Sequence, residues 1–530
     1  MPLSNIKRRS FLKQSTILSA GFLALRMPVI AGPFAAGELN GLQIPLDKKL
    51  DPDWIKSLYK RGNPTVYLKS KNELQYIGMP VGGINCGTLY LGGDGRLWLW
   101  DIFNKNQEGI EPKEVMWSNE GQPVRKILSR DGACYIQPSK DIRPIEQGFA
   151  IKIEHAGKTI IKELNSNSWD EISFEATYPI ATIRYTDKNI PVSIILQAYS
   201  PFIPLDEDNS GLPATILSFK VTNKTNELVK VELIGWLENG INKFSTKSGD
   251  GEKNNTIINN KKSTVVFSQF NAVDINKLSE AGDTGSMCLS SINKNGIAIT
   301  SLDQFPITET SFVQKQESKT SKDAGEKLIG AIKVVNEIKP GKTISADFVI
   351  SWHFKNVGKR IDIPDAAGGN YYATKFPDAL AVNNYIANKF SFLSSQTHLW
   401  KNTWYDATLP HWFMERTFMN IATMATTTSH RFASGRSWAW EGVGACEGNC
   451  LHVWQYAQAV GRIFPALEKD NRQRVDLGLS LMDDGGIWFR GEYDKRPAIA
   501  GQAGTVLRIY REHQMSSNND FLKYNCQHIK

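Results

Sequence analysis

The residues of this chain best suited to chemistry lie between Trp438 and Trp454, where one carboxylate, Glu441, stands among tryptophans and glycines. Pyranose rings bind on aromatic faces, glycine lets a backbone approach a ligand closely, and a carboxylate beside apolar rings can be tuned as nucleophile or acid. The combination predicts a sugar-cleaving site. The alternative interpretation of the same residues is a packed core edge with a solvated charge.

Two cysteines and a histidine in this stretch, Cys446, Cys450 and His452, raise the alternative of a metal site. A structural zinc site needs four ligands, and the sequence offers no second CxxC or HxxxH set to complete them. The two cysteines could share a helix face, and a disulfide with another partner stays open in an oxidising compartment. We therefore expect no metal and no cofactor.

The amino terminus has the three parts of a twin-arginine export signal. The basic segment Lys7–Lys13, with Arg8 and Arg9, precedes an apolar run from Thr16 to Leu25 and then small residues, so that cleavage is expected between Ala31 and Gly37. The apolar run is shorter than the about 20 residues that span a bilayer. No later segment is long and apolar enough either, so we expect export to the periplasm, with the export machinery as a partner, and no stable membrane span.

The formal charge of +8 overstates the basicity of the exported protein. Five of the 62 basic residues lie in the leader, which leaves 57 basic against 54 acidic residues, a net charge of +3. No basic stripe with interleaved aromatic residues occurs, so nucleic acid is not an expected partner.

The central part of the chain, from about Gly78 to Phe354, has the pattern of strands. Short β-branched runs alternate at period two and are separated by turn residues, which predicts a β-sandwich. Strands are expected at 181–185, 192–198, 215–221 and 229–234, and polar loops at 245–263 and 313–327.

Helical spacing of apolar residues replaces this pattern after the connector at 368–372. Helices are expected at 378–395, 412–429, 453–463, 468–482, 504–515 and after Asp520. A sandwich followed by helices with aromatic, glycine-rich loops predicts packing on an (α/α)6 toroid. A closed toroid needs roughly twelve helices of ordinary length, so this one is expected to be incomplete.

These patterns divide the chain into five parts. We expect a signal peptide at 1–36, an extension at 37–75, the β-sandwich at 76–356, a linker helix region at 357–395 and the first part of an (α/α)6 catalytic domain at 396–530.

Four blocks give the chain a resemblance to glycoside hydrolase family 116, the family of bile-acid β-glucosidase or non-lysosomal glucosylceramidase. They are Gly78–Gly87 with Trp98-Leu99-Trp100, Ala198–Leu205, Gly235–Asn239 and the segment around Glu441. The glycines of the first block could also suggest a nucleotide loop, but no helix, no Lys-Ser/Thr pair and no acidic partner follows them. We interpret them as tight strand turns.

The resemblance implies a retaining β-glycosidase that acts on a β-glucoside, a glycolipid or an oligosaccharide. Glu441, followed by Gly442, matches the family's nucleophile, and His452 stands at the place of its polar sugar-binding residue, where many members carry Asp. Trp438 and Trp440 are candidates for a sugar platform, with core packing as the alternative for at least one of them.

The family's acid/base is an Asp in an Asn-Thr-Tyr-Asp-like setting, at a distance from the nucleophile that would place it after Lys530. No matching segment occurs in this chain, and its only loop carboxylates in the right region are Asp483, Asp484, Glu492 and Asp494. The resemblance therefore implies a chain that lacks the acid/base and has impaired activity. Two other functions stay open: a non-catalytic carbohydrate-binding sandwich protein, and a phosphorylase or another glycosidase with the same domain plan.

Overall fold

The computed structural model describes residues 50–75, 77–104, 113–117, 125–129, 143–292, 296–314, 317–358, 361, 363–439, 448–451, 458–491 and 494–529. Side chains are described for these residues except 113–117, 125–129, 458–459, 494 and 529. The chain forms two units, Met1–Lys60 and Arg61–Lys530. In the first unit, helix α2 (Pro52–Ser57) begins where the Asp51 carboxylate accepts the Asp53 N–H at 2.8 Å.

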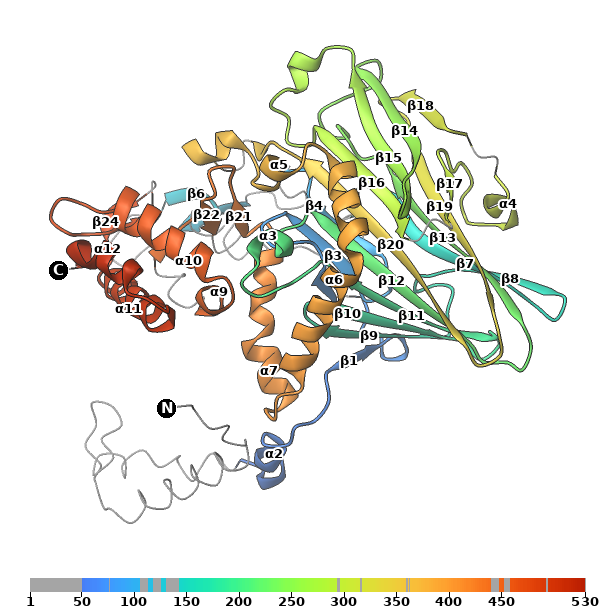
Figure 1. Cartoon of the computed structure of the whole chain (residues 1–530), viewed down its shortest axis with the longest axis horizontal. Helices are drawn as coiled ribbons and strands as arrows, with labels where there is room; N and C mark the ends of the chain where they lie inside the picture. The colour runs from blue at the N-terminus through green and yellow to red at the C-terminus, as the bar shows by residue number, and fades with distance from the viewer. Residues whose placement is uncertain are drawn as a thin grey trace, which may run out of the picture. The chain divides into compact units, whose positions relative to one another are not determined.

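Two antiparallel sheets form the sandwich of the second unit, which confirms a β-sandwich followed by a helical region (Figure 1). The larger sheet has the order β1 (Val66–Leu68), β9 (Glu171–Thr177), β10 (Ile180–Thr186), β11 (Val192–Tyr199), β12 (Ala214–Asn223), β20 (Thr343–Phe354), β16 (Gly285–Ile292), β15 (Ser263–Ala272), β14 (Gly251–Asn259) and β18 (Lys319–Asp323). The smaller has the order β17 (Gly296–Ile299), β19 (Ile329–Ile338), β13 (Val229–Glu238), β7 (Gln147–His155) and β8 (Lys158–Glu163).

A three-stranded sheet, β2 (Gly78–Pro80), β3 (Thr88–Gly92) and β4 (Leu97–Asp101), accompanies the sandwich. Two-stranded pairs are formed by β5 (Lys113–Trp117) with β6 (Arg125–Ser129), β21 (Ser429–Arg431) with β22 (Ser437–Ala439), and β23 (Trp488–Arg490) with β24 (Asp494–Pro497).

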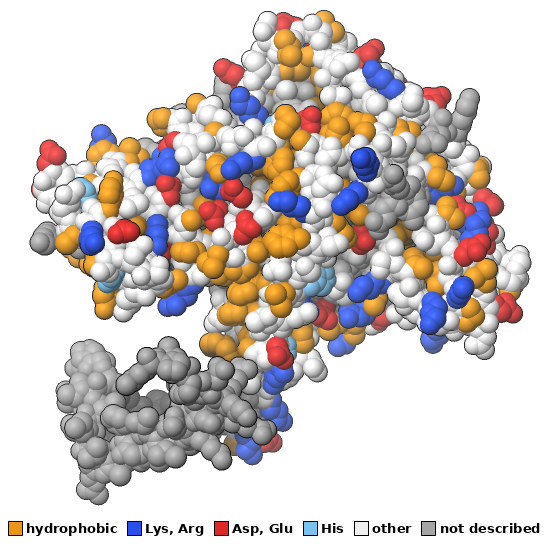
Figure 2. Space-filling model, viewed as in Figure 1, with side chains coloured by type: hydrophobic (Ala, Val, Ile, Leu, Met, Phe, Trp, Pro, Cys, Tyr) orange, Lys and Arg blue, Asp and Glu red, His pale blue; other side chains and the backbone are white. Residues whose placement is uncertain are grey.

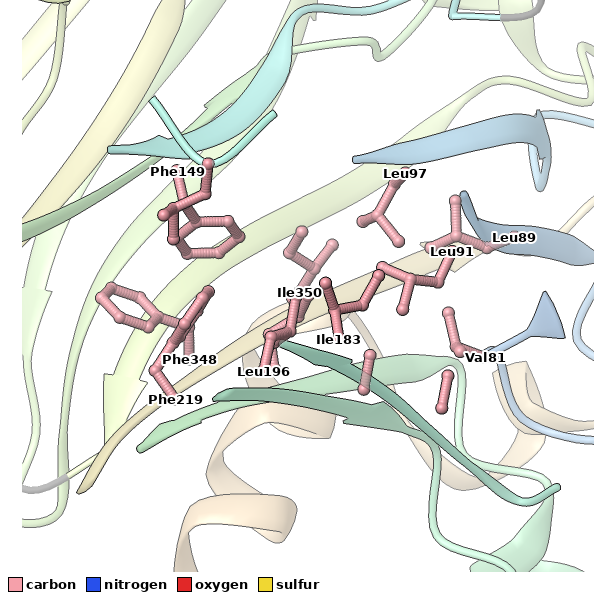
Figure 3. Packing of buried hydrophobic residues seen from close by; sticks show 14 of the residues in the cluster. Val81, Leu89, Leu91, Leu97, Phe149, Ile183, Leu196, Phe219, Phe348 and Ile350 are labelled. Atoms are coloured by element: carbon pink, nitrogen blue, oxygen red, sulfur yellow. The ribbon is translucent and has the colours of Figure 1, made fainter. Parts of the chain in front are cut away.

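The core lies between the facing sheets, where alternating apolar residues meet (Figure 3). Phe149 of β7, Phe219 of β12 and Phe348 of β20 form an aromatic triad with ring centroids 4.7 to 6.0 Å apart. Leu89, Leu91 and Leu97 of the three-stranded sheet join the same cluster. Met79, Val81, Ile84 and Cys86 of the glycine-rich block at Gly78–Gly87 belong to this cluster too, so the block is part of the sandwich's core.

The strands expected at 181–185, 192–198, 215–221 and 229–234 form as β10, β11, β12 and β13. The polar loops expected at 245–263 and 313–327 are wrong in part, because β14 and β18 lie within them. Asn254 and Asn255 of β14 are 4% and 0% exposed, yet the side chain of Asn255 donates to Thr300 O at 2.9 Å and accepts from Ser268 Oγ at 2.7 Å. These hydrogen bonds let polar residues occupy a buried strand.

The helices after the sandwich are α5 (Tyr372–Lys375), α6 (Ala379–Tyr405), α7 (His411–Thr417), α9 (Gln458–Ile463), α10 (Pro465–Asn471), α11 (Ile499–Met515) and α12 (Asp520–Ile529), with a π-helix η8 (Arg472–Leu479) continuing α10 and 3-10 helices η6 (Pro364–Gly368) and η7 (Met419–Ala425). Shorter pieces α3 (Glu207–Ser210), α4 (Glu309–Phe312), η3 (Lys69–Lys71) and η4 (Ile275–Leu278) lie between the strands. Within the described part of the chain, no helix combines the length and hydrophobicity that crossing a bilayer requires.

Helix α6 begins at the expected place, capped by Asp378, and continues past the expected end at Ser395 to Tyr405. It packs on β15, β16 and β20 and runs along the larger sheet (Figure 1). Two side-chain hydrogen bonds fix this contact: the fully buried Asn383 accepts from Ser290 Oγ at 2.5 Å and donates to Ser263 Oγ at 3.3 Å.

Replacing Asn383 by Ala is expected to destabilise the protein by about 1–3 kcal/mol, because the buried hydroxyl of Ser290 loses the side-chain oxygen to which it donates a short hydrogen bond. Asn388→Ala is the matched control on the same helix, where the residue is exposed and the change should stay within about 0.5 kcal/mol. Urea unfolding followed by circular dichroism measures both. Equal effects of the two variants would contradict the role given to Asn383.

Lys and Arg side chains alternate with Asp and Glu over the face shown in Figure 2, without one large field of a single sign. This distribution agrees with the nearly balanced charge of the chain after Arg26.

Candidate active site

A short hairpin leads the chain into the segment that contains Glu441. Its strands β21 and β22 pair Ser429 with Ala439, His430 with Trp438 and Arg431 with Ser437. The turn closes through Phe432 N–H to Arg436 O at 3.0 Å and Gly435 N–H to Phe432 O at 2.8 Å. Gly435 has a φ of 88°, a conformation that glycine adopts without strain.

The hairpin and the residues before it are docked on the glycine-rich block of the sandwich. Asn85 N–H donates to Met424 O at 2.7 Å, Ser429 Oγ donates to Asn85 Oδ1 at 2.5 Å, and Cys86 forms a β-bridge with His430. Asn85 has a φ of 59°, the left-handed conformation that Asn tolerates. The sandwich therefore positions the hairpin through hydrogen bonds that join residues more than 300 positions apart in the sequence.

Close approach explains two of the glycines in this block. A Cβ at Gly83 would lie 2.1 Å from Leu212 O, and one at Gly82 would lie 3.3 Å from the Trp352 ring. The indole N–H of Trp352 in turn donates to Cys86 O at 3.2 Å. The two glycines let the block pack against β20 and against Leu212, which lies just before β12.

Trp438 is 2% exposed and packs with Phe432 and Val357 in a small hydrophobic cluster. Its ring lies 5.8 Å from the His430 ring, and a Cβ at Gly448 would lie 2.0 Å from its Cε2 atom. The structure places Trp438 in the packing role, one of the two that its sequence context allows. Its side chain fixes the hairpin rather than presenting a face to solvent.

Ala439 and Asn449, which flank residues 440–448 in the sequence, are joined by hydrogen bonds. Asn449 N–H donates to Ala439 O at 2.8 Å, and Asn449 Oδ1 accepts from Ala439 N at 3.4 Å. The φ of Asn449 is 53°. Trp440, Glu441 and His452, predicted as platform, nucleophile and sugar-binding residue, lie outside the described residues, as does Cys446.

Cys450 is 3% exposed, and its backbone forms a β-bridge with Arg490. Its thiol is free, as are those of Cys86, Cys288 and Cys526. Burial raises the pKa of the Cys86 and Cys288 thiols far above the ordinary value, which makes these two cysteines poor nucleophiles.

Ion pairs surround the hairpin, and the sequence alone did not predict them. Arg431 donates to Asp208 at 2.8 Å and lies 3.6 Å from the centre of the Tyr371 ring, while Lys375 lies 3.0 Å from the same carboxylate. Burial raises the pKa of Asp208, but hydrogen bonds from Lys375 and Arg431 outweigh this and hold the pKa below its usual value. Asp208 of α3 and Arg431 of β21 lie far apart in the sequence, and no periodic pattern of residues predicts that they pair.

A cleft beside these ion pairs, lined by Glu207, Asp208, Lys375 and Arg431 among others, has a volume of about 20 Å³. That is room for roughly one water molecule and not for a sugar ring. The charged residues around this cleft therefore serve to hold the β21–β22 hairpin in place.

A second ion pair fixes the hairpin turn, because the 2%-exposed Arg436 side chain donates to Asp365 at 2.9 Å. Burial raises the pKa of Asp365, and hydrogen bonds from Ser434 and Arg436 lower it below the usual value. Of the loop carboxylates named from the sequence, Asp483 and Asp484 are exposed in the turn between Met482 and Gly486, and Asp484 accepts the Gly486 N–H at 2.9 Å. Glu492 lies outside the described residues, and the backbone of Asp494 pairs with Arg490.

Gly448→Ala is expected to destabilise the chain by about 1–3 kcal/mol, since the new methyl group would overlap the Trp438 indole. Gly368→Ala is the control, because its Cβ would lie 3.3 Å from Ala433 Cβ and needs only a small shift. Urea-unfolding midpoints of the two variants test this. A Gly448→Ala variant as stable as Gly368→Ala would show that Trp438 does not pack against this backbone.

Solved structures with some likeness to the chain have TM-scores below 0.5. A putative kojibiose phosphorylase from the human microbiome has a TM-score of 0.36 and 9% identity over 88% of this chain, which spans 58% of that protein's length. The family 92 α-mannosidase from Bacteroides thetaiotaomicron has a TM-score of 0.29 and 9% identity over 84% of this chain and 56% of its own. A galactose mutarotase related enzyme from Lactobacillus acidophilus has a TM-score of 0.26 and 9% identity over 54% of this chain and 100% of its own.

The sequence model of "beta-glucosidase 2, glycosyl-hydrolase family 116 N-term" matches residues 78–392, more than half of the chain. The match contains the glycine-rich block, both sheets of the sandwich except strand β1, and the first half of α6. The chain therefore belongs to glycoside hydrolase family 116.

Proposed function

We propose that the chain is the sandwich and hairpin part of a retaining β-glycosidase that releases a terminal β-linked glucose from a glycolipid, an oligosaccharide or another β-glucoside. The observation that carries this proposal is the docking of the β21–β22 hairpin on the family's amino-terminal domain, through Asn85, Met424 and Ser429. That hairpin ends at Ala439, directly before Trp440 and Glu441.

In this mechanism, Glu441 attacks the anomeric carbon and the bond to the leaving oxygen breaks, which gives a glycosyl-enzyme ester. A second carboxyl, about 5–5.5 Å away in retaining enzymes, protonates the leaving oxygen and then activates the water that hydrolyses the ester. Trp440 would stack on the sugar and His452 would hydrogen-bond a sugar hydroxyl. We do not assign the second carboxyl to Asp483 or Asp484, because both are exposed in a tight turn.

The helices from α7 onward are proposed as part of an (α/α)6 catalytic domain. Their order along the chain supports this, since α7, α9, α10, α11 and α12 follow the sandwich one after another, with the pairs β21–β22 and β23–β24 between them. The hairpin segment would then lie at the mouth of the domain, where loops meet.

Hydrolysis of an aryl β-glucoside by the full chain, with the product followed by proton NMR, tests the reaction class. We expect β-glucose as the first product, formed slowly in keeping with the impaired activity that the family resemblance implies, and a rate independent of phosphate. Turnover that requires phosphate would identify a phosphorylase, and α-glucose as the first product would overturn the retaining mechanism. Sugar binding without turnover, unchanged in Glu441→Gln, would instead favour a non-catalytic carbohydrate-binding protein.

We also propose export through the twin-arginine route, on the pattern of Lys7–Lys13 and Thr16–Leu25. Replacing both Arg8 and Arg9 by Lys is expected to retain the chain in the cytoplasm, whereas the control Lys7→Arg should leave export unchanged. Fractionation of cells with an antibody against the chain measures this. Normal export of the Arg8→Lys/Arg9→Lys variant would overturn the proposed route.

A further inference from the structure

A second hollow lies in the sandwich, away from the hairpin residues. We name it the sandwich pocket; it is lined by Lys69, Asn72, Leu74, Gln75, Ile77, Gly92, Gly93, Asp94, Trp98, Arg143, Ser166 and Asn167. Its volume of about 380 Å³ falls in the range of roughly 300–1,000 Å³ of small-molecule sites. The space is large enough for a sugar ring, unlike the cleft beside Arg431.

Trp98 of β4 provides a partly exposed aromatic surface in this pocket, and its orientation is fixed. It pairs across the sheet with Tyr90, and the two ring centroids are 5.2 Å apart. A Cβ at Gly78 would lie 2.9 Å from Trp98 Nε1, and one at Gly92 would lie 3.0 Å from Cδ1. The two glycines thus let the indole lie against the backbone, which holds the ring in one position.

Asp94 and Arg143 form an ion pair at the edge of the same pocket. Arg143 Nη2 lies 3.2 Å from Asp94 Oδ1, and that oxygen also accepts the Arg96 N–H at 3.1 Å. The carbonyl of Asp94 accepts from the Tyr185 hydroxyl at 3.1 Å, which holds the turn between β3 and β4 against β10. The carboxylate and guanidinium are therefore held in place before any ligand arrives.

Three amides at the pocket are available to a ligand. Among the described residues, the side chains of Asn72, Gln75 and Asn167 make no hydrogen bond, and all three are exposed. Each amide offers both donors and an acceptor, as the hydroxyl groups of a sugar require. A sugar ring has an apolar face and hydroxyl groups at its edge. The fixed indole of Trp98 can stack on the face, while the free side-chain amides can form hydrogen bonds with the hydroxyl groups.

The charges of the pocket favour a neutral ligand. The Arg143 guanidinium faces Asp94, and the Lys69 amine donates to the Trp169 carbonyl. Both cations thus already have partners, and a phosphate or carboxylate ligand would have to compete with them.

We propose that the sandwich pocket is an ancillary binding subsite for a neutral saccharide, with Trp98 as the stacking surface and Asn72, Gln75 and Asn167 as hydroxyl partners. It would hold part of an oligosaccharide or glycoside at the sandwich, and its binding does not depend on Glu441. This goes beyond the proposed catalytic function, which uses none of these residues.

The test uses the full chain labelled with 5-fluorotryptophan and titrated with glucose, cellobiose and gentiobiose under fluorine NMR. The resonance absent in Trp98→Phe identifies Trp98. We expect it to shift saturably with at least one disaccharide, and equally so in Glu441→Gln. Asn72→Ala/Asn167→Ala should weaken this binding at least about tenfold, corresponding to the loss of about 1.4 kcal/mol. Trp412→Phe, a change at an exposed tryptophan of α7, is the matched control.

No saturable shift of the Trp98 resonance with any of the three sugars would overturn the proposal. So would an affinity, measured by calorimetry, that is unchanged in both Trp98→Ala and Asn72→Ala/Asn167→Ala. A Trp98 shift in a parallel titration with glucuronate, and none with the neutral sugars, would also overturn it and would assign an acidic ligand. A shift lost in Glu441→Gln would place the sugar at the catalytic segment instead.

Discussion

Glu441→Gln is expected to lower turnover of 2,4-dinitrophenyl β-glucoside by roughly 10⁴- to 10⁶-fold. Losses of this size are typical when an enzyme that forms a covalent intermediate loses one of its catalytic residues. This substrate is the sharpest choice, because dinitrophenolate leaves without protonation. The pre-steady-state burst of dinitrophenolate therefore reports the attack of the nucleophile without help from an acid, whereas steady-state turnover also includes the base-assisted hydrolysis of the ester.

Glu447→Gln is the matched control, since it changes a second carboxylate of the same segment by the same amount. It should keep most of the activity. Adding azide to Glu441→Ala should restore turnover, with azide attacking from the side the carboxylate would use and giving α-glucosyl azide. Full activity of Glu441→Gln, or a β-glucosyl azide, would remove Glu441 from the nucleophile's role.

The largest expected loss of stability follows from Asp476→Ala, at about 3–5 kcal/mol. Asp476 is a fully enclosed carboxylate of the π-helix η8, with 2% of its side chain exposed. Arg472, 1% exposed, donates to it, and Thr505 of α11 donates at 3.0 Å. Burial raises the pKa of Asp476, and it lowers the pKa of neighbouring Arg508 to about 9. Without the Asp476 carboxylate, the buried guanidinium groups of Arg472 and Arg508 lose a negative charge that offsets the cost of burying them.

Asp470→Ala is the control for this prediction. Asp470 and Arg474 form the same i,i+4 pair at 2.7 Å in the same helical segment, but their side chains are 32% and 39% exposed. Pairs of this kind are worth only about 0–1 kcal/mol. Hydrogen exchange of peptides from α10 to α11, with urea unfolding, compares the two variants. Similar losses would show that burial of the Asp476 network is not what holds these helices together.

The sandwich strands could be predicted from sequence because their signal is local. In β11 and β12, apolar residues such as Ile194 and Phe219 alternate with half-buried or exposed ones, and the sheet buries every second side chain. In β14, Asn254 and Asn255 remove that signal. Residues outside β14 satisfy them: Asn255 donates to Thr300 O and accepts from Ser268 of β15, and Asn254 accepts from Ser321 of β18. Sequence spacing does not reveal such partners.

The candidate site was predicted only as a group of residue types, and Trp440, Glu441 and His452 lie outside the described residues. Glu441 and the aromatic residues around it could be found as a cluster, but the residues that hold the hairpin come from distant parts of the chain. Asn85 bonds Ser429, and Asp208 pairs with Arg431, over separations that no periodicity covers. The burial of Trp438 needed the structure as well, because a tryptophan in this sequence context fits a sugar platform and a core equally. Gly448 against its indole places it in the core.

The most direct test of the central claim, that Glu441 is the nucleophile of a retaining glycosidase, is covalent labelling with 2,4-dinitrophenyl 2-deoxy-2-fluoro-β-glucoside followed by peptide mass spectrometry. The activated leaving group makes the first step independent of an acid, and the fluorine slows hydrolysis of the ester. We predict one 2-fluoroglucosyl group per chain, on the peptide containing Glu441, and none in Glu441→Gln. Labelling of another carboxylate, or no label on the folded chain, would contradict this account.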